Sequence, residues 1–266
     1  MRLPQRAPPA RAGCRSTLAR AQTEAPVSRR HRMFFVGMAI AATMTVFFGF
    51  APSYYLRSLT HITQYPTGVP VSPSLAPLVH IHATVFSAWI LLFVAQSTLV
   101  AAGRTDIHRR LGVAGAVLAP VMIVLGSATA VRGARDGWNP GGPFPDSLGF
   151  MVVGFADMFV FSVFVAAGLY FRRRPEAHKR LMLLATVGGL MWPAITRMPY
   201  VAGRPILMFG LLGSLVLASA VRDFVLRSRV HPVSLCGGLP ILAVLPIRVA
   251  IGLTPAWHSF AVWLIR

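Results

Sequence analysis

The chain has 266 residues, of which 55% are hydrophobic and 12% are charged, and its mean hydropathy is +0.62. This composition excludes an ordinary soluble domain, in which about a quarter of the residues are charged. The net charge of +19 would suit a nucleic-acid-binding protein, but the bases lie between long apolar runs and form no patch with stacking aromatic residues. The sequence therefore predicts a polytopic membrane protein that binds no nucleic acid.

Residues 1–32 form a basic leader. They include eight Arg, four Pro and a single acid, Glu24, and show no apolar period. Such a segment cannot bury enough surface to offset the cost of ordering, so we predict a disordered, cytosolic leader. The Arg-rich, acid-poor start also resembles an organelle transit peptide, and Met33 is an alternative start of the protein.

Seven apolar runs follow the leader, each long enough to cross a hydrocarbon layer of about 30 Å. They cover residues 33–51, 78–102, 111–131, 149–171, 181–200, 204–221 and 233–253. We therefore predict an all-α integral membrane protein, with a bundle of about seven transmembrane helices in residues 33–254. Residues 255–266, with Trp257 and Trp263, are expected to lie at the membrane interface.

The distribution of bases predicts the orientation. The leader and every second loop hold 19 Lys and Arg, while the other side holds 7. Because loops rich in these residues stay in the cytosol, the N-terminus is expected inside and the C-terminus outside, in a bacterial inner membrane. The expected partners are the lipid bilayer and its anionic headgroups.

A short motif occurs twice, 70 residues apart, and predicts a duplicated helical hairpin. Asp106-Ile-His108-Arg109-Arg110-Leu111 returns as Glu176-Ala-His178-Lys179-Arg180-Leu181. Thr105 and Pro175 are expected to begin the two helices, which places His108 and His178 in first turns. The positive end of the helix dipole disfavours imidazolium there, so each histidine is biased towards the neutral form that ligates a metal. The alternative is that these bases serve topology and lipid headgroups.

The second apolar run carries two further histidines. His80 and His82 are two residues apart, so they point about 200° apart on a helix and cannot chelate one ion together. His82 shares a stripe with Trp89 and Gln96 at a spacing of seven residues. Such a stripe packs against other helices or forms part of a ligand or proton path.

Asp157 lies well inside the fourth apolar run, where an ionised carboxylate needs a partner. Arg197 and Arg248 are the candidates, and Arg197 is preferred. The pair either holds helices together or, with Gln96, lines a path for a substrate, quinone or proton.

Several function classes are excluded. The only lysine, Lys179, lies in a charged loop, so the buried Schiff base of a retinal protein is not available. The sequence has no Gly-rich phosphate loop, so it predicts no nucleotide site. It also has no zinc-protease helix motif and no nucleophile elbow. Cys14 and Cys236 lie in unrelated segments and predict no disulfide framework.

Several motifs together resemble a group of uncharacterised bacterial multi-span membrane proteins. They are Phe47-Phe-Gly-Phe-Ala-Pro-Ser-Tyr-Tyr-Leu56, Val79-His80-Ile-His82, Gln96, Gly103-Arg104 and His108-Arg109-Arg110-Leu111-Gly112. This resemblance covers about residues 33–266 and implies fold and location. More distantly, the paired histidines resemble b-type cytochrome helix bundles, in which two histidines on facing helices hold each haem. That resemblance implies an inner pair of His108 with His178, and leaves only His61 or His258 to partner His80 or His82.

Three hypotheses remain. The first is a redox or electron-transfer component that binds haem b or a metal ion through His108, His178, His80 or His82, with a membrane redox partner or a second copy of the chain. The second is a proton-coupled carrier that uses Asp157 and Arg197. The third is a structural or assembly protein without catalysis.

Overall fold

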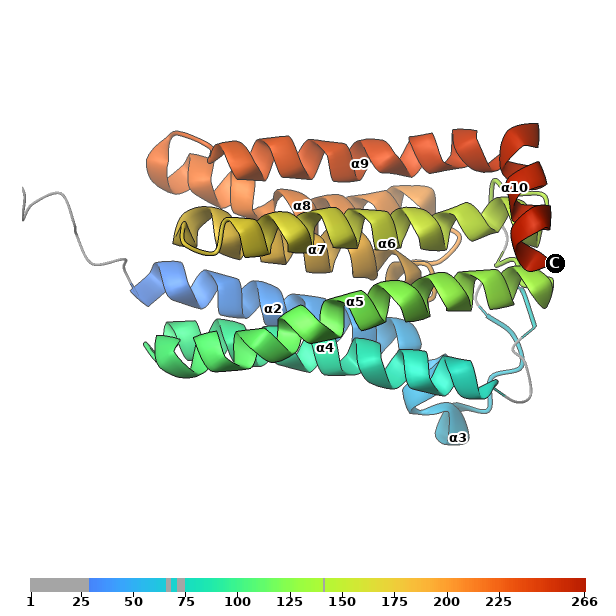
Figure 1. The fold of residues 1–266 in the computed structure, drawn as a ribbon, viewed down its shortest axis with the longest axis horizontal. Helices are drawn as coiled ribbons and strands as arrows, with labels where there is room; N and C mark the ends of the chain where they lie inside the picture. Colours follow the sequence, from blue (N-terminus) through green and yellow to red (C-terminus); the bar gives the residue numbers. More distant parts are fainter. Residues whose placement is uncertain (1–28, 66–67, 71–74, 141) are drawn as a thin grey trace, which may run out of the picture.

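The structure is a computed structural model that describes residues 29–65, 68–70, 75–140 and 142–266. Within these ranges the regular structure is helical, apart from an isolated bridge between Gln64 and Pro70. The long helices lie side by side (Figure 1) and are α2 (Arg29–Phe50), α4 (Pro77–Ala101), α5 (Thr105–Arg135), α6 (Ser147–Tyr170), α7 (Pro175–Ile195), α8 (Pro205–Arg227) and α9 (Pro232–Gly252). The π-helical η1 (Ala51–Tyr55) continues α2, α3 (Arg57–Thr60) follows it, and α10 (Pro255–Ile265) lies across one end of the bundle.

The helix boundaries agree with several of the predicted ones. Thr105 is the first residue of α5 and Pro175 is the first residue of α7, as expected from the repeated motif. Residues 196–204 separate α7 from α8, which confirms the predicted break there. Helix α2 begins at Arg29, so the end of the predicted disordered leader is helical, and residues 1–28 lie outside the described part of the chain.

Five helices form a closed ring. Contacts run from α2 to α4, α5, α6 and α7 in turn, and α7 packs back against α2. Helices α8 and α9 pack on the outside of α7, and α9 also packs on α6. Inside the ring, Trp89 of α4 meets Phe161 of α6 edge to face at 4.9 Å and donates its Nε1–H to Thr186 of α7 over 3.2 Å. These contacts tie three helices together at mid-height.

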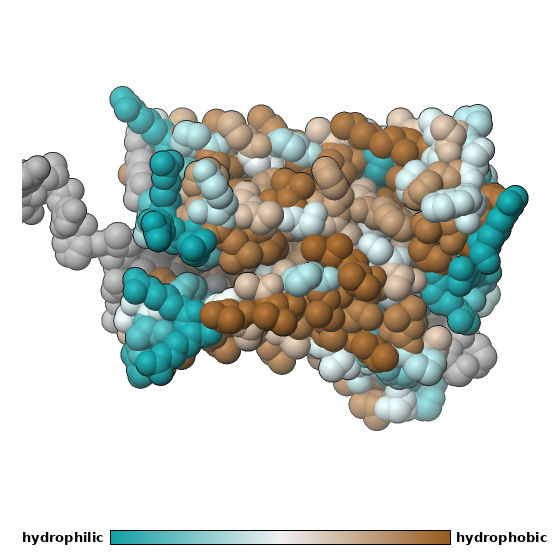
Figure 2. Space-filling view, viewed as in Figure 1, coloured by the Kyte–Doolittle hydropathy of each residue, from teal (hydrophilic) through white to brown (hydrophobic). Residues whose placement is uncertain are grey.

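Six helices of the described chain are long and apolar enough to cross a membrane. They span Met33–Tyr55, Pro77–Ala101, Thr105–Arg135, Ser147–Tyr170, Pro205–Leu226 and Pro232–Gly252. Figure 2 shows hydrophobic side chains over the middle of the bundle and hydrophilic ones towards both ends. A surface of this kind fits a hydrocarbon layer with water on either side.

Helix α7 is not among these six, although it is as long as α9. Its first two turns carry Glu176, Lys179 and Arg180, which lower its mean hydropathy. It is nevertheless deeply buried, since α2, α6, α8 and α9 all pack against it. A helix that neighbouring helices shield from lipid does not need a uniformly apolar surface.

A buried ion pair fixes α8 on α7. The Arg180 side chain is fully buried and donates Nη2–H to both Asp223 oxygens, over 2.6 and 2.8 Å, and Nε–H to Oδ2 over 3.1 Å. Its Nη1 donates to the Glu176 carboxylate over 2.6 Å. The guanidinium therefore has partners on both edges, which is the condition under which a buried charge is tolerated.

Helix α10 is held to the end of the bundle by polar contacts. Trp257 donates its indole N–H to the Leu148 carbonyl over 2.8 Å, and Arg135 donates to the Ile265 carbonyl over 2.9 Å. Asp146 caps α6 by accepting the Gly149 N–H, and this bond together with nearby His258 lowers the pKa of the Asp146 carboxyl. The predicted interfacial tail is thus a helix docked on the bundle.

We expect Asp223→Asn to destabilise the protein by about 3 kcal/mol, because the fully buried Arg180 loses most of its counter-charge. Thermal unfolding in a neutral detergent would measure the loss. The control is Asp136→Asn, which breaks an exposed pair with Arg132 and should leave stability nearly unchanged. Equal effects of the two substitutions would show that the buried pair has no special role.

Candidate functional site

The two motif histidines lie together at the end of the bundle where α5 and α7 begin. The ring centroids of His108 and His178 are 6.2 Å apart, and their planes are nearly perpendicular at 81°. Both residues are partly buried. The structure therefore places these two side chains next to each other at one depth, as the repeated motif predicts.

A backbone carbonyl orients one of the two rings. His178 Nδ1 lies 2.8 Å from the carbonyl oxygen of Gly168, and only a protonated nitrogen can donate to that oxygen. In the neutral form, His178 Nε2 then carries a free lone pair. Metal-ligating histidines are usually held by such a bond from the other ring nitrogen to a carbonyl. His108 Nδ1 is buried without a hydrogen-bond partner.

Gln96 and small residues border the pair. The side-chain oxygen of Gln96 is buried and has no hydrogen-bond partner. Gly112 and Gly115 lie one and two turns beyond His108 on the same face of α5, and a Cβ on Gly112 would meet only Gln96 Nε2, at 3.6 Å. At Gly115 a Cβ would meet Leu92 Cδ2 at 3.3 Å, so α4 packs closely against this face of α5, and the Gln96 oxygen is an unused acceptor there.

The histidines of α4 face different neighbours, as their spacing predicts. His80 is exposed, and its Nδ1 lies 3.3 Å from the Tyr54 hydroxyl. His82 stacks on Phe86 with ring centroids 3.9 Å apart and has a backbone hydrogen bond with Leu125 of α5. Its Nδ1 is buried without a partner. His82, not His80, is therefore turned into the bundle.

His258, one of the two histidines left to complete an outer pair, contacts a carboxylate. Its Nε2 lies 3.2 Å from the Asp146 oxygens. The other, His61, is exposed at the C-terminal end of α3. Neither has a contact with His80 or His82 in the described residues.

The prediction that Asp157 pairs with Arg197 was wrong. Asp157 of α6 accepts a hydrogen bond from Arg248 Nη1 of α9 over 2.9 Å, and both side chains are about 5% exposed or less. Arg248 also lies over the Trp192 ring at 4.6 Å. Both α7 and α9 pack on α6. Asp157 lies level with Gly189 of α7, where a Cβ would meet the Asp157 carbonyl oxygen at 3.0 Å, and Arg197 lies about two turns further along, so depth decides the pairing.

Arg197 occupies an aromatic cage at the opposite end of the bundle from the His108–His178 pair. Its guanidinium carbon lies 4.9 Å from the Trp138 ring, 5.2 Å from Phe50 and 5.9 Å from Tyr65. Nη1 donates to the Pro193 carbonyl over 2.7 Å. Burial of the guanidinium lowers the pKa of Arg197 below its usual value.

The predicted polar path is thus divided into three groups. Asp157 pairs with Arg248, the Gln96 side chain lies against Gly112 of α5, and Arg197 lies over the Trp138 ring. Asp223, the partner of Arg180, is a functional residue that the sequence pattern does not reveal. Asp157 lies alone inside an apolar run, whereas Asp223 lies among bases near the C-terminal end of α8, where a carboxylate is expected to be solvated.

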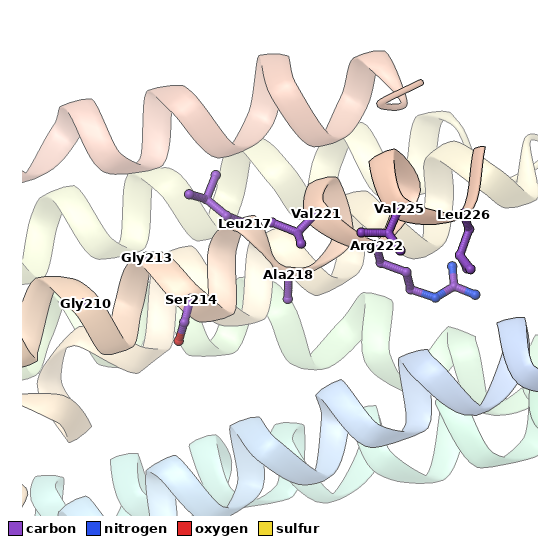
Figure 3. A pocket seen from close by; sticks show the side chains of 9 residues that line it. All are labelled: Gly210, Gly213, Ser214, Leu217, Ala218, Val221, Arg222, Val225 and Leu226. Atoms are coloured by element: carbon purple, nitrogen blue, oxygen red, sulfur yellow. The ribbon is translucent and has the colours of Figure 1, made fainter. Parts of the chain in front are cut away.

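A groove of about 830 Å³ lies outside the five-helix ring, along α8 (Figure 3). Gly210, Gly213 and Ala218 line its floor, and Arg222 stands near the end of it, over the Phe34 ring of α2 at 4.7 Å. None of the histidines lines this groove. It is therefore separate from the histidine sites.

The fold and these sites define an all-helical bundle with several helices suited to crossing a membrane. Comparisons with family models, curated proteins and solved structures give no match to this chain. Function is therefore argued from the geometry of the sites.

The pairing of Asp157 predicts a coupling that a double-mutant cycle measures. We expect Asp157→Leu and Arg248→Met each to cost about 3 kcal/mol, because each leaves one buried charge alone, while the double variant costs much less than the sum. Asp157→Leu combined with Arg197→Met should instead be additive. Unfolding free energies of the five variants in one detergent give the result, and coupling to Arg197 would contradict the observed pairing.

Proposed function

We propose that the protein is a membrane redox component that holds a haem between His108 and His178. The main observation behind this proposal is the distance between the centroids of the two imidazole rings. A metal–nitrogen bond is about 2.0–2.1 Å, and a ring nitrogen lies about 1.1 Å from the centre of its ring, so two imidazoles on one metal have centroids about 6 Å apart. The observed 6.2 Å matches this spacing.

The number of available ligands favours haem over a bare metal ion. Among the described residues, no group of three or more His, Cys, Asp and Glu side chains is placed to hold a metal. The pair supplies two axial nitrogens, which is what a bis-histidine haem takes from its protein, because the porphyrin provides the other four. Exposed bases at the same end, Arg104 and Arg109, suit pairing with the propionates.

The ring orientations support the same role. The hydrogen bond from His178 Nδ1 to the Gly168 carbonyl leaves a lone pair on His178 Nε2, and His108 Nδ1 is buried without a partner. Neutral histidine binds iron through such a lone pair, and the carbonyl raises its basicity. A haem near the end of the bundle is suited to exchanging electrons with a membrane redox partner.

A reduced-minus-oxidised absorption spectrum of the purified protein should show a b-type haem band. His108→Ala and His178→Ala should each remove most of it, because each takes away one axial ligand. His80→Ala is the matched control, since His80 is exposed and bonds to Tyr54, and it should keep the band. A wild-type protein from haem-supplied cells that shows no band would reject the proposal.

A second variant tests ligation without removing a ligand. His178→Met keeps an axial donor, so the band should shift and the midpoint potential should rise, as methionine ligation favours the reduced iron. An unchanged potential in a variant that retains its haem would place the ligand elsewhere.

We further propose that α7 is a seventh span, and that the bundle sits in a bacterial inner membrane with its basic end in the cytosol. Helix α2 starts at one end of the bundle and the C-terminus lies at the other (Figure 1), which an odd number of spans requires. The α4–α5 and α6–α7 hairpins place His108 and His178 at matching positions, which supports a duplicated hairpin. The excess of 19 bases against 7 supports the orientation.

Labelling of single cysteines on intact cells tests this orientation. With Cys14 and Cys236 replaced by Ser, a membrane-impermeant maleimide should label Asp136→Cys but not Asp106→Cys, two exposed positions at opposite ends of α5. Lysed cells should label both and serve as the control. The reverse pattern would invert the topology, and equal labelling of both on intact cells would show that α5 does not span.

A further inference from the structure

The groove along α8 is a second candidate site, which the proposed haem does not use. Helix α8 packs mainly against α7 and α9, and its remaining face carries exposed apolar side chains, such as Val221 and Val225. The lining of the groove is apolar except for Ser214 and Arg222. Ser214 donates its hydroxyl to the Leu211 carbonyl over 2.8 Å, so its hydrogen bond stays within the helix. The groove is therefore an apolar trough with one charged side chain.

The floor of the groove is open. A Cβ on Gly210 or on Gly213 would meet nothing within 4 Å in the described part of the chain. On the α9 side of the same helix, by contrast, a Cβ on Gly238 would meet Val216 at 3.2 Å. The volume of about 830 Å³ lies within the range of about 300–1,000 Å³ that is typical of ligand sites. This face of α8 is thus shaped to receive a ligand, whereas its α9 side is closely packed.

Arg222 places a positive charge at one end of the groove. Its guanidinium carbon lies 4.7 Å from the centroid of the Phe34 ring of α2, and Lys179 Nζ lies 4.9 Å from that of the adjacent Phe35. The ionic side chains at these two rings, with their partners, include three bases and two acids: Lys179, Arg180 and Arg222, and Glu176 and Asp223. These five groups carry a net positive charge, which complements an anionic headgroup.

The length of the groove fits one leaflet of a bilayer. Ser214, Ala218 and Arg222 are spaced four residues apart, so they share one side of α8 (Figure 3). Arg222 and Gly210 are twelve residues apart, about 18 Å along the helix, and one leaflet of the hydrocarbon layer is about 15 Å thick. A lipid with its headgroup at Arg222 therefore reaches Gly210 with its acyl chain. A second copy of the chain suits the groove less well, because a symmetric contact would bring two Arg222 charges into one interface.

We propose that the groove along α8 binds an anionic phospholipid. One acyl chain lies along the floor from Ala218 to Gly210, and a phosphate oxygen of the headgroup accepts a hydrogen bond from the Arg222 guanidinium. None of the histidines lines the groove, so the proposal does not depend on haem being bound.

Photo-crosslinking locates the bound lipid. The full chain is reconstituted into vesicles of dioleoyl phosphatidylcholine that contain a small, equal fraction of photoreactive phosphatidylglycerol or photoreactive phosphatidylcholine, with the same diazirine on the same acyl chain. Mass spectrometry of the labelled peptides gives the labelling ratio of the two probes on each helix. One base at the headgroup level favours an anionic lipid by about fivefold, so phosphatidylglycerol should label the groove residues at least that much more strongly than phosphatidylcholine does.

Two substitutions test the charge and the shape of the groove separately. Arg222→Gln should lower the labelling ratio on α8 about fivefold. Its matched control, Arg110→Gln, removes an exposed base of α5 at the same end of the bundle and should leave that ratio unchanged. Gly213→Phe fills the groove and should remove the labelling of α8 by both probes. Its control is Val117→Phe, which adds bulk to an exposed position of α5 and should leave α8 labelling unchanged.

The outcomes separate a lipid site from ordinary bilayer contact. Equal labelling of α8 by the two probes in the wild-type protein would overturn the proposal, and this comparison needs no variant to fold. Arg110→Gln lowering the ratio as much as Arg222→Gln does would also overturn it. A groove that neither probe labels, with Gly213→Cys forming a disulfide-linked dimer, would assign the face to a second copy instead. A protein without a haem band that shows the predicted labelling would reject the haem and keep the lipid site.

Discussion

The cost of burying a charge organises this bundle more than any other interaction. Carboxylates are scarce, and the two that are most deeply buried, Asp157 and Asp223, each lie against an arginine of a neighbouring helix. Because an unpaired ion in the apolar interior costs several kcal/mol, these two pairs fix which helices are neighbours. The α6–α9 contact and the α7–α8 contact each contain one of them. Other arginines, such as Arg104, Arg109 and Arg204, lie exposed at the ends of the helices, where water solvates them.

The pairing rule explains what the sequence could and could not reveal. A turn-forming or helix-starting residue acts locally, so Thr105 and Pro175 predicted the starts of α5 and α7 and hence the shared depth of His108 and His178. The helices α7 and α9 both lie beside α6, so the partner of Asp157 depends on which arginine lies at its depth, and that is a property of the whole bundle. Arg197 and Arg248 both come near the ends of apolar runs, so nothing local distinguished them.

The low mean hydropathy of α7 has a related cause. A window of apolar residues measures suitability for lipid contact, whereas α7 contacts four other helices. Its charges at Glu176 and Arg180 are satisfied by each other and by Asp223, so they are compatible with burial even though they reduce the mean hydropathy. The most central helix of such a bundle is thus the one that composition identifies least well.

The side chains between the two ends of the five-helix ring bear on the choice between a redox protein and a carrier. His82 and Gln96 are fourteen residues apart on α4, about 21 Å along the helix, and Trp89 lies midway, packed on Phe161 and bonded to Thr186. Trp89, Phe161 and Thr186 are buried, and they lie between the unpartnered His82 Nδ1 at one end of α4 and the unpartnered Gln96 Oε1 at the other. A carrier needs a continuous polar route for an ion or a proton, whereas two aromatic rings fill this level and the Thr186 hydroxyl is already bonded to the indole. Electrons do not need such a route, and for this reason we propose redox chemistry and not transport.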